Sequence, residues 1–310
     1  MENMPEKLAG KLRPPSPAAV ALGFATIYVV WGSTYLGIRF AVETIPPFLM
    51  GGSRFLAGGL LLHLFLRLRG AAAPSRAQVR EAVVIGALLL LGGNGLVSWA
   101  EQFLPSGLTA LMVGATPLVF AALEWVLPPH RRPGRMGLVG IALGTAGVAW
   151  LQAGGAWAGA FPWGAMAALA VASVSWAAGS LRSKRNHGGG DPFMAASLQM
   201  LFGGLLQLGV GAGLGEWTRF EPAAVSLRSG LAWLYLVLVG SLIAFGTYIW
   251  LLRASTPAKV ATYAYVNPVI AVFLGWACAG EAVTASMLAA AAIIVASVVL
   301  ITRQAAATRG

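Results

Sequence analysis

The chain is poor in charged residues, cysteine and histidine. Only 10% of its 310 residues are charged, against roughly 25% in soluble domains. There is one cysteine, Cys278, which excludes an intramolecular disulfide and a thiolate metal cage. The histidines, His63, His130 and His187, are scattered along the chain, so we expect no metal site.

Catalytic motifs are also missing from the sequence. There is no P-loop, so the chain by itself does not use ATP, and there is no H-E-x-x-H pattern. Paired aspartates suited to intramembrane hydrolysis, or to binding Mg²⁺ on a diphosphate, are missing too. We therefore expect no cofactor and no enzymatic activity. An intramembrane enzyme acting on a lipid or prenyl substrate is a remote alternative.

What the chain has instead is long apolar runs, because 58% of its residues are hydrophobic. A run of about 20 residues is long enough to cross the roughly 30 Å hydrocarbon layer as a helix. We count ten such runs: residues 18–41, 48–67, 82–100, 107–127, 136–152, 162–182, 192–214, 230–252, 258–279 and 283–301. The pattern predicts an all-helical integral membrane protein with ten transmembrane helices.

Several helix boundaries are marked by capping residues. Pro47 and Pro192 stand where two of the helices begin, a position at which the missing N–H costs nothing. Ser75 and Gln78 have the spacing of a capping box, and Asp191 is a candidate N-cap.

The net charge of +11 follows a topological pattern. With the N-terminus in the cytoplasm, 17 of the 21 lysines and arginines fall in cytoplasmic segments and only Arg219 and Arg228 in outer connections. The positive-inside rule then predicts a multi-pass membrane protein with both termini cytoplasmic. We expect a small-molecule substrate and the lipid bilayer as partners, and no nucleic acid.

The second half of the chain repeats the first. Tryptophans and prolines recur at two fixed spacings of 145 and 151 residues: Trp31 with Trp176, Pro47 with Pro192, Trp99 with Trp250, and Pro117 with Pro268. Five helices per repeat is an odd number, so the second repeat enters from the opposite face. We expect two inverted five-helix repeats, residues 18–152 and 162–302, around a central cavity. Cytoplasmic tails, residues 1–17 and 303–310, flank them.

Polar and aromatic side chains inside the apolar runs predict a substrate site. Polar groups deep in a bilayer are costly and usually face the protein interior, and aromatic rings suit an apolar or aromatic solute. The candidate substrate-binding residues are Trp31, Asn94, Trp99, Thr116, Trp176, Tyr248, Tyr265 and Asn267. The alternative is ordinary packing, in which hydroxyls bond their own helix and aromatic rings form interfacial belts.

Arg54 is the one charge well inside a predicted span, so it needs a partner. Glu43 and Glu101, at the outer surface, are the candidates. Arg54 could bind a substrate carboxylate, anchor an outer gate with Glu43, or form an ion pair that fixes helices. No acidic residue is expected near mid-membrane, so the sequence gives no clear proton site.

Pro117 and Pro268 occupy equivalent positions inside two predicted helices. A proline there frees a backbone carbonyl and bends the helix, which predicts a pair of hinges, with cavity lining or a stable bend as alternatives. Gly140 and Gly144 form a G-x-x-x-G stripe, which indicates packing inside the bundle or a dimer interface. We expect the protein to function as a monomer, with a dimer as the alternative.

Five short motifs resemble the bacterial ten-helix drug/metabolite transporter superfamily: Trp31-Gly-Ser-Thr-Tyr35, Pro46-Pro-Phe48 followed by Arg54-Phe55, Ala115-Thr-Pro117, Tyr265-Val-Asn-Pro268 and Gly280-Glu281. The resemblance covers nearly the whole chain and implies an inner-membrane exporter, most similar to amino-acid and metabolite exporters. The chain lacks the four-helix form and the glutamate in the first helix of the small multidrug members. We expect alternating-access export of small metabolites, above all neutral or aromatic amino acids, with efflux of hydrophobic drugs as the alternative.

Overall fold

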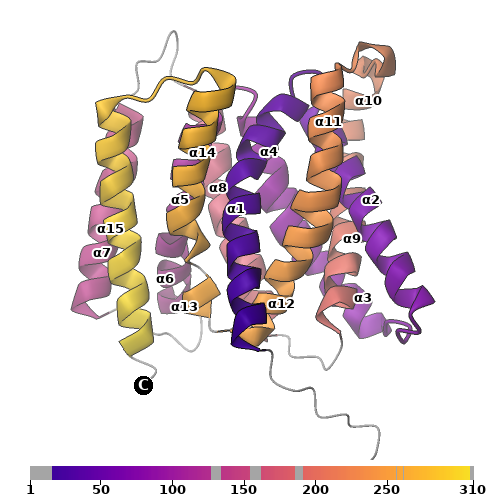
Figure 1. The fold of residues 1–310 in the computed structure, drawn as a ribbon, viewed down its shortest axis with the longest axis horizontal. Helices are drawn as coiled ribbons and strands as arrows, with labels where there is room; N and C mark the ends of the chain where they lie inside the picture. The colour runs from indigo at the N-terminus through magenta and orange to yellow at the C-terminus, as the bar shows by residue number, and fades with distance from the viewer. Residues whose placement is uncertain are drawn as a thin grey trace, which may run out of the picture.

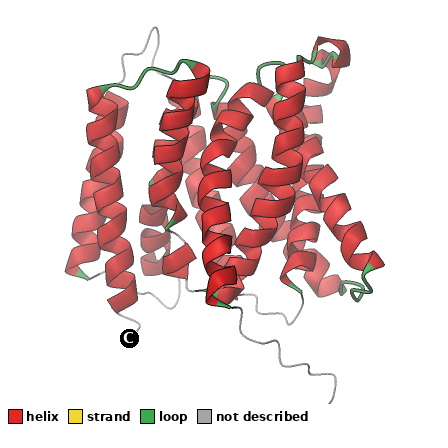
Figure 2. Cartoon of the chain, viewed as in Figure 1, coloured by secondary structure: helices red, strands yellow, loops and turns green. Residues whose placement is uncertain are grey.

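The computed structural model describes residues 16–126, 134–153, 162–185, 191–255, 257–260 and 262–307. These residues form helices joined by short connections, and no strand occurs among them (Figure 2). An apolar chain in lipid satisfies its backbone hydrogen bonds within helices, because no water is available to do so. Seven helices are long and apolar enough to cross a membrane, and three shorter apolar helices accompany them. The all-helical membrane fold is therefore confirmed, whereas ten crossings stay a prediction.

The elements of the first half are α1 (Pro17–Ala41), α2 (Pro47–Leu68), α3 (Arg76–Gly86), the π-helix η2 (Ala87–Gly95), α4 (Leu96–Ala100), α5 (Ser106–Gly114), α6 (Thr116–Val126) and α7 (Arg135–Ala153). Those of the second half are α8 (Trp163–Arg185), α9 (Pro192–Gly213), α10 (Glu216–Arg219), the 3₁₀-helix η3 (Pro222–Ala224), α11 (Leu227–Tyr235), the π-helix η4 (Leu236–Phe245), α12 (Gly246–Ala254), α13 (Pro257–Val260), α14 (Tyr263–Ala279) and α15 (Ala285–Ala307).

The predicted caps are confirmed. The Gln78 backbone N–H donates to the Ser75 hydroxyl at 3.2 Å, and the Gln78 side chain accepts from the Ser75 N–H at 2.7 Å. Asp191 accepts the Phe193 N–H at 3.0 Å. Pro47 and Pro192 are the first residues of α2 and α9.

Helix α1 begins at one end of the bundle and α15 finishes at the same end, which is at the bottom of Figure 1. We call this the lower end, and the end where α2 begins the upper end. Helices α7 and α15 pack against each other at one side of the bundle. Within this pair the Ser297 hydroxyl donates to the Gly140 carbonyl at 2.7 Å and packs against Gly144. The G-x-x-x-G stripe therefore packs inside the chain.

Two π-helical stretches, which the sequence patterns did not indicate, lie in corresponding spans. Shifting η2 by the 151-residue spacing gives residues 238–246, which overlap η4. A π-helix leaves carbonyls without their usual helical donors, and side chains supply donors here. Ser175 donates to the Leu88 carbonyl at 2.8 Å, and Gln207 donates to the Leu90 carbonyl at 2.9 Å.

The most extensive helix contact joins α2 to α9, and glycines bring the two backbones together. A Cβ atom on Gly204 would lie 2.7 Å from the Leu56 nitrogen and 2.9 Å from the Gly52 oxygen. A Cβ on Gly59 would lie 2.8 Å from the Leu201 nitrogen. Small residues allow such close approach in place of the hydrophobic force that lipid removes. Gly59 and Gly204 therefore serve the packing of α2 against α9.

We expect Gly204→Ala to destabilise the protein, because the new methyl group meets backbone atoms that no rotamer change can move. Overpacking of this kind costs about 1–3 kcal/mol. Gly209→Ala, on the same helix, is the matched control because nothing lies within 4 Å of its added Cβ. Thermal unfolding of the purified protein in detergent measures the difference, and equal melting temperatures would contradict the backbone contact.

Candidate functional site

A cavity of about 80 Å³ lies between the two halves of the bundle. Residues of α1, α2, η2, α4, α5, α8, η4 and α14 form its walls. One water molecule needs roughly 10–15 Å³, so the cavity holds several waters but is small for a bound metabolite. Five residues that the sequence singled out line it: Trp31, Arg54, Asn94, Trp176 and Asn267.

An aromatic cluster contributes Trp31, Trp176 and Tyr263 to the cavity wall. The Trp31 ring lies 5.6 Å from Trp176, 4.7 Å from Tyr248 and 5.2 Å from Tyr263, between ring centroids. The polar tips are satisfied inside the cluster, since Trp176 Nε1 donates to the Tyr263 hydroxyl at 3.1 Å. The Tyr248 hydroxyl lies 2.8 Å from that of Ser180. Rings in such arrangements attract each other beyond their burial, so these contacts hold together the helices that carry them.

Arg54 lines the cavity with an incomplete set of hydrogen bonds. Its Nε donates to the Ser241 hydroxyl at 2.7 Å, and its guanidinium carbon lies 4.6 Å from the Phe55 ring centroid. The residue is 2% exposed, yet Nη1 has no hydrogen-bond partner among the described residues. Leaving a buried charged donor unpaired is costly, so this nitrogen is available to a ligand.

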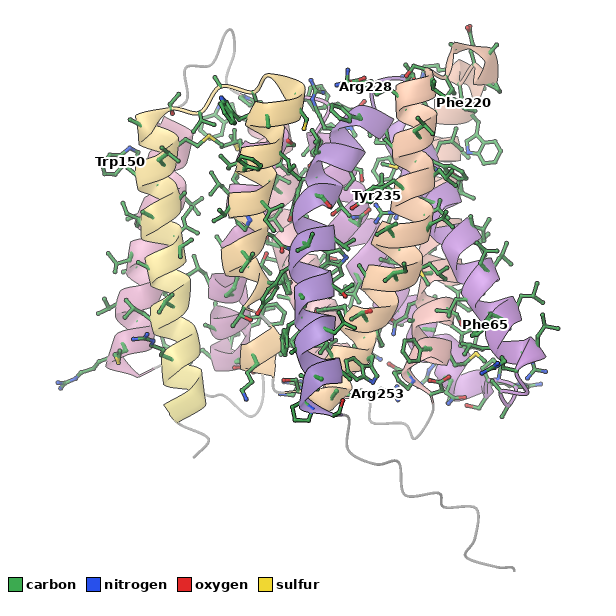
Figure 3. All side chains as sticks on the ribbon, viewed as in Figure 1. Phe65, Trp150, Phe220, Arg228, Tyr235 and Arg253 are labelled. Atoms are coloured by element: carbon green, nitrogen blue, oxygen red, sulfur yellow. The ribbon has the colours of Figure 1, made fainter. Side chains whose placement is uncertain are left out.

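Glu43, one of the two candidate partners of Arg54, forms an ion pair with a different arginine in this structure. Glu43 Oε1 lies 3.5 Å from Nη2 of Arg228, and the Arg228 guanidinium stacks over the Phe40 ring at 3.7 Å. Figure 3 shows Arg228 at the upper end of the bundle, above Tyr235. The sequence could not distinguish these arrangements, because Glu43 and Arg228 come from connections 185 residues apart.

Three candidate residues lie outside the cavity wall. Trp99 lines a separate groove of about 540 Å³ at the upper end, together with Glu43, Gln102 and Glu216. Thr116 is buried behind the wall, where its hydroxyl donates to the Val113 carbonyl at 2.5 Å and lies 3.4 Å from the Ser173 hydroxyl. Tyr248 packs behind Trp31.

The Tyr265 side chain lies outside the described residues. Wall residues that sequence reasoning did not propose for the cavity include Tyr35 and Val97. Their residue types alone do not separate them from ordinary packing residues.

Pro117 and Pro268 lie on two helical spans that touch. The first span breaks at Ala115, between α5 and α6, and Pro117 is the second residue of α6. Pro268 is inside α14, and a Cβ on Gly114 would lie 2.7 Å from its Cγ. The same Cβ would lie 3.3 Å from the Ala264 carbonyl, which Pro268 leaves without its helical donor. Near each proline the regular helical hydrogen bonding is therefore interrupted, at a place where two helices touch. The hinge role stays a prediction.

Asn267 joins α14 to α1. With its amide nitrogen turned toward them, the side chain donates to the Tyr28 carbonyl at 3.0 Å and to the Tyr263 carbonyl at 3.2 Å. The residue is 4% exposed and lines the cavity. Asn267 thus both shapes the wall and holds together the helices that form it.

The comparison with known proteins accords with this architecture. The model of the EamA-like transporter family matches the chain twice, over residues 18–152 and 162–303. The chain belongs to the EamA-like transporter family. The resemblance to the drug/metabolite transporter superfamily, of which this family is a part, is thereby confirmed.

Relatives of this EamA-like transporter carry transporter names. The uncharacterized inner membrane transporter YedA of Escherichia coli (strain K12) is 42% identical over 279 residues, which cover 89% of this chain and 88% of the relative. The uncharacterized transporter YvbV of Bacillus subtilis (strain 168) is 27% identical, covering 94% of this chain and 93% of the relative. The chain is therefore a membrane transporter, with a small-molecule substrate and a lipid environment.

A crystal structure with 22% sequence identity shares the fold of this EamA-like transporter. It superposes with a TM-score of 0.67, covering 95% of this chain and all of the other one. At this identity the likeness concerns the fold alone.

We expect the aromatic cluster to control access from the lower end. In a chain with Cys278→Ser and Ser173→Cys, the new thiol in the cavity wall should react slowly with a membrane-impermeant maleimide. Adding Trp31→Ala removes three ring contacts, each worth about 0.5–1.5 kcal/mol, and should speed labelling about tenfold or more. Val29→Ala, on the same helix but with a side chain 59% exposed, is the control. An unchanged labelling rate in the Trp31 variant would contradict this control of access.

Proposed function

We propose that the protein exports small zwitterionic metabolites, with amino acids as the favoured class, across the bacterial inner membrane. The observation that carries this proposal is the Nη1 nitrogen of Arg54, buried in the cavity wall without a hydrogen-bond partner among the described residues. A carboxylate forms short, charge-assisted hydrogen bonds with a guanidinium. A solute carboxylate would therefore complete the hydrogen bonding of Arg54.

The rest of the wall suits the other parts of an amino acid. Trp31, Trp176 and Tyr263 offer aromatic faces to an apolar or aromatic side chain, and Asn94 and Ser173 offer uncharged polar groups. No acidic residue is among the described residues that line the cavity. A cationic drug would lack a counter-charge there, whereas a zwitterion brings its own.

Alternating access would move the solute through the cavity. In support, the two halves of the chain make corresponding contacts: α1 packs on α14 and η4, and α8 packs on α6 and η2. Such matching contacts support inverted five-helix repeats with the site between them. Opening the lower side separates the aromatic cluster, and opening the upper side moves the charged groups around Arg54. The breaks at Pro117 and Pro268 would let α6 and α14 follow these motions.

We propose that the lower end faces the cytoplasm, as the distribution of lysine and arginine indicates. Alkaline phosphatase, which needs the oxidising periplasm, should be active when inserted after Thr218 and inactive when fused after Gly310. A green fluorescent protein fusion at Gly310 should fluoresce. The reverse pattern would place both termini outside and turn the proposed export into uptake.

The amino-acid assignment is tested by counterflow in liposomes that contain the purified protein and no ion gradient. Arg54→Gln should slow the exchange of labelled neutral amino acids by about tenfold or more, since a hydrogen bond to a charged group is worth about 1.5–3 kcal/mol. Arg228→Gln is the matched control, because it removes an arginine of the upper surface and should leave the exchange within twofold, roughly the effect of an exposed pair.

Efflux of hydrophobic drugs is the second candidate, which the predominantly apolar wall favours. It predicts that wild-type liposomes exchange a neutral hydrophobic drug and no amino acid, and that Arg54→Gln leaves drug efflux unchanged. Absence of any amino-acid exchange by the wild-type protein would overturn the favoured substrate class.

A further inference from the structure

Glu101 is a buried carboxyl group without a hydrogen-bond partner. It follows α4 directly, is 0% exposed, and neither of its carboxylate oxygens has a hydrogen-bond partner among the described residues. Its backbone is held in place, because Arg39 Nη1 donates to the Glu101 carbonyl at 3.2 Å. The side chain is thus fixed in the protein interior while its charge-bearing atoms are left unsatisfied.

Two other glutamates at the upper end have carboxylates that accept hydrogen bonds, unlike that of Glu101. Glu216 accepts the N–H groups of Phe48 and Leu49 at 3.3 and 2.7 Å, at the start of α2. Glu281 accepts the N–H groups of Ser106 and Gly107 at 2.7 and 3.0 Å, at the start of α5. Both serve as helix caps, a favourable place for a negative charge. Glu101 has no such role.

Charged and titratable groups face Glu101 from each side without pairing with it. Tyr35 and Arg39 come from α1, Arg54 from α2, and Glu281 from the segment after α14. In the part of the chain that the structure describes, Glu101 forms no ion pair within 4.0 Å. Two arginines therefore lie near enough to act on the carboxyl, but neither neutralises it by direct contact.

Burial favours the protonated form of this side chain. An ionised carboxylate removed from water without hydrogen bonds is strongly destabilised, and binding a proton removes that cost. Burial, together with the charge of Glu281, raises the pKa of the Glu101 carboxyl well above its usual range, while Arg39 and Arg54 act in the opposite direction. Burial without hydrogen-bond partners therefore favours the protonated form of Glu101 in this conformation.

Glu101 stands between the central cavity and the upper groove. Val97, one helical turn earlier, lines the cavity, as does the neighbouring Tyr35. Gln102 and Phe103, which follow Glu101, line the groove. A route that opens the cavity toward the upper end therefore passes Glu101 and brings water to it.

We propose that Glu101 is a proton-binding site linked to the opening of the cavity toward the upper end. Glu101 holds its proton while this side is closed. On opening, the O–H bond of the carboxyl breaks, the proton passes to water at the upper end, and the carboxylate is stabilised by water and by the nearby arginines. Closing requires a proton to return. The proposal rests on the proposed transport function for its physiological meaning, but the proton site can be measured without any substrate.

Infrared spectroscopy of the purified protein provides the direct test. At neutral pH the wild-type protein should show the carbonyl stretch of a protonated carboxylic acid, and Glu101→Gln should lose this band. Glu43→Gln, which replaces a partly exposed glutamate of the same end, should keep it. A wild-type spectrum without the band, or a band that survives in Glu101→Gln, would overturn the proposal. Absence of the band from the wild-type spectrum overturns the proposal without any variant, so poor folding of Glu101→Gln does not leave the proposal untested.

Thermal stability supplies a second readout with a defined sign. A carboxyl whose pKa is raised in the folded state contributes stability that is lost as the pH rises through the folded-state value. The melting temperature of the wild-type protein should therefore fall as the pH rises above about 4.3, the ordinary pKa of a glutamate, and that of Glu101→Gln should fall less. Identical pH profiles for the two proteins would contradict the proton site.

Counterflow then separates this proposal from the proposed function. Wild-type exchange should depend on the pH at the upper side, and Glu101→Gln should abolish that dependence. Absent exchange combined with an intact infrared band would overturn the amino-acid assignment alone. Active, pH-dependent exchange in Glu101→Gln would overturn the proton site alone.

Discussion

The backbone contact between α2 and α9 positions most of the groups on which the site depends. Gly59 and Gly204 let the two helices touch, which brings the Gln207 side chain of α9 to the Leu90 carbonyl of η2. Leu90 and Asn94 of this π-helix line the cavity, as does Arg54 of α2. In lipid, where apolar surfaces gain little by association, contacts of this kind determine the arrangement of helices.

Hydrogen bonding separates structural polar groups from candidate functional ones. Glu216 and Glu281 cap helices, and Ser175 and Gln207 satisfy π-helical carbonyls. Arg54 and Glu101 are the charged side chains whose buried atoms lack a partner among the described residues. An unsatisfied buried charge is costly. That Arg54 and Glu101 are both retained beside the cavity therefore supports functional roles for them. A ligand would supply the missing partner of Arg54, and a proton that of Glu101.

The lower and upper sides of the cavity are chemically different. The lower one is an aromatic cluster whose polar tips are paired with one another. The upper one contains Arg39, Arg54 and Glu101, and Glu101 forms no direct ion pair among the described residues. Apolar contacts hold the lower side irrespective of pH, whereas the upper side responds to protonation. Such asymmetry is useful to a carrier, because a solute or a proton can then influence one side independently of the other.

The sequence by itself determined the membrane class, the helical fold and its capped boundaries, because hydropathy, proline and capping side chains act over a few residues. The repeated tryptophans and prolines also marked Trp31, Trp176 and Asn267, which meet at one cavity. Only the tertiary structure decided that Trp99 faces another groove, that Glu43 pairs with Arg228, and that Glu101 is buried without a partner. Local sequence cannot predict these three arrangements, because each depends on contacts between helices that are far apart in the chain. The π-helical turns also change which side chains of a helix face the cavity.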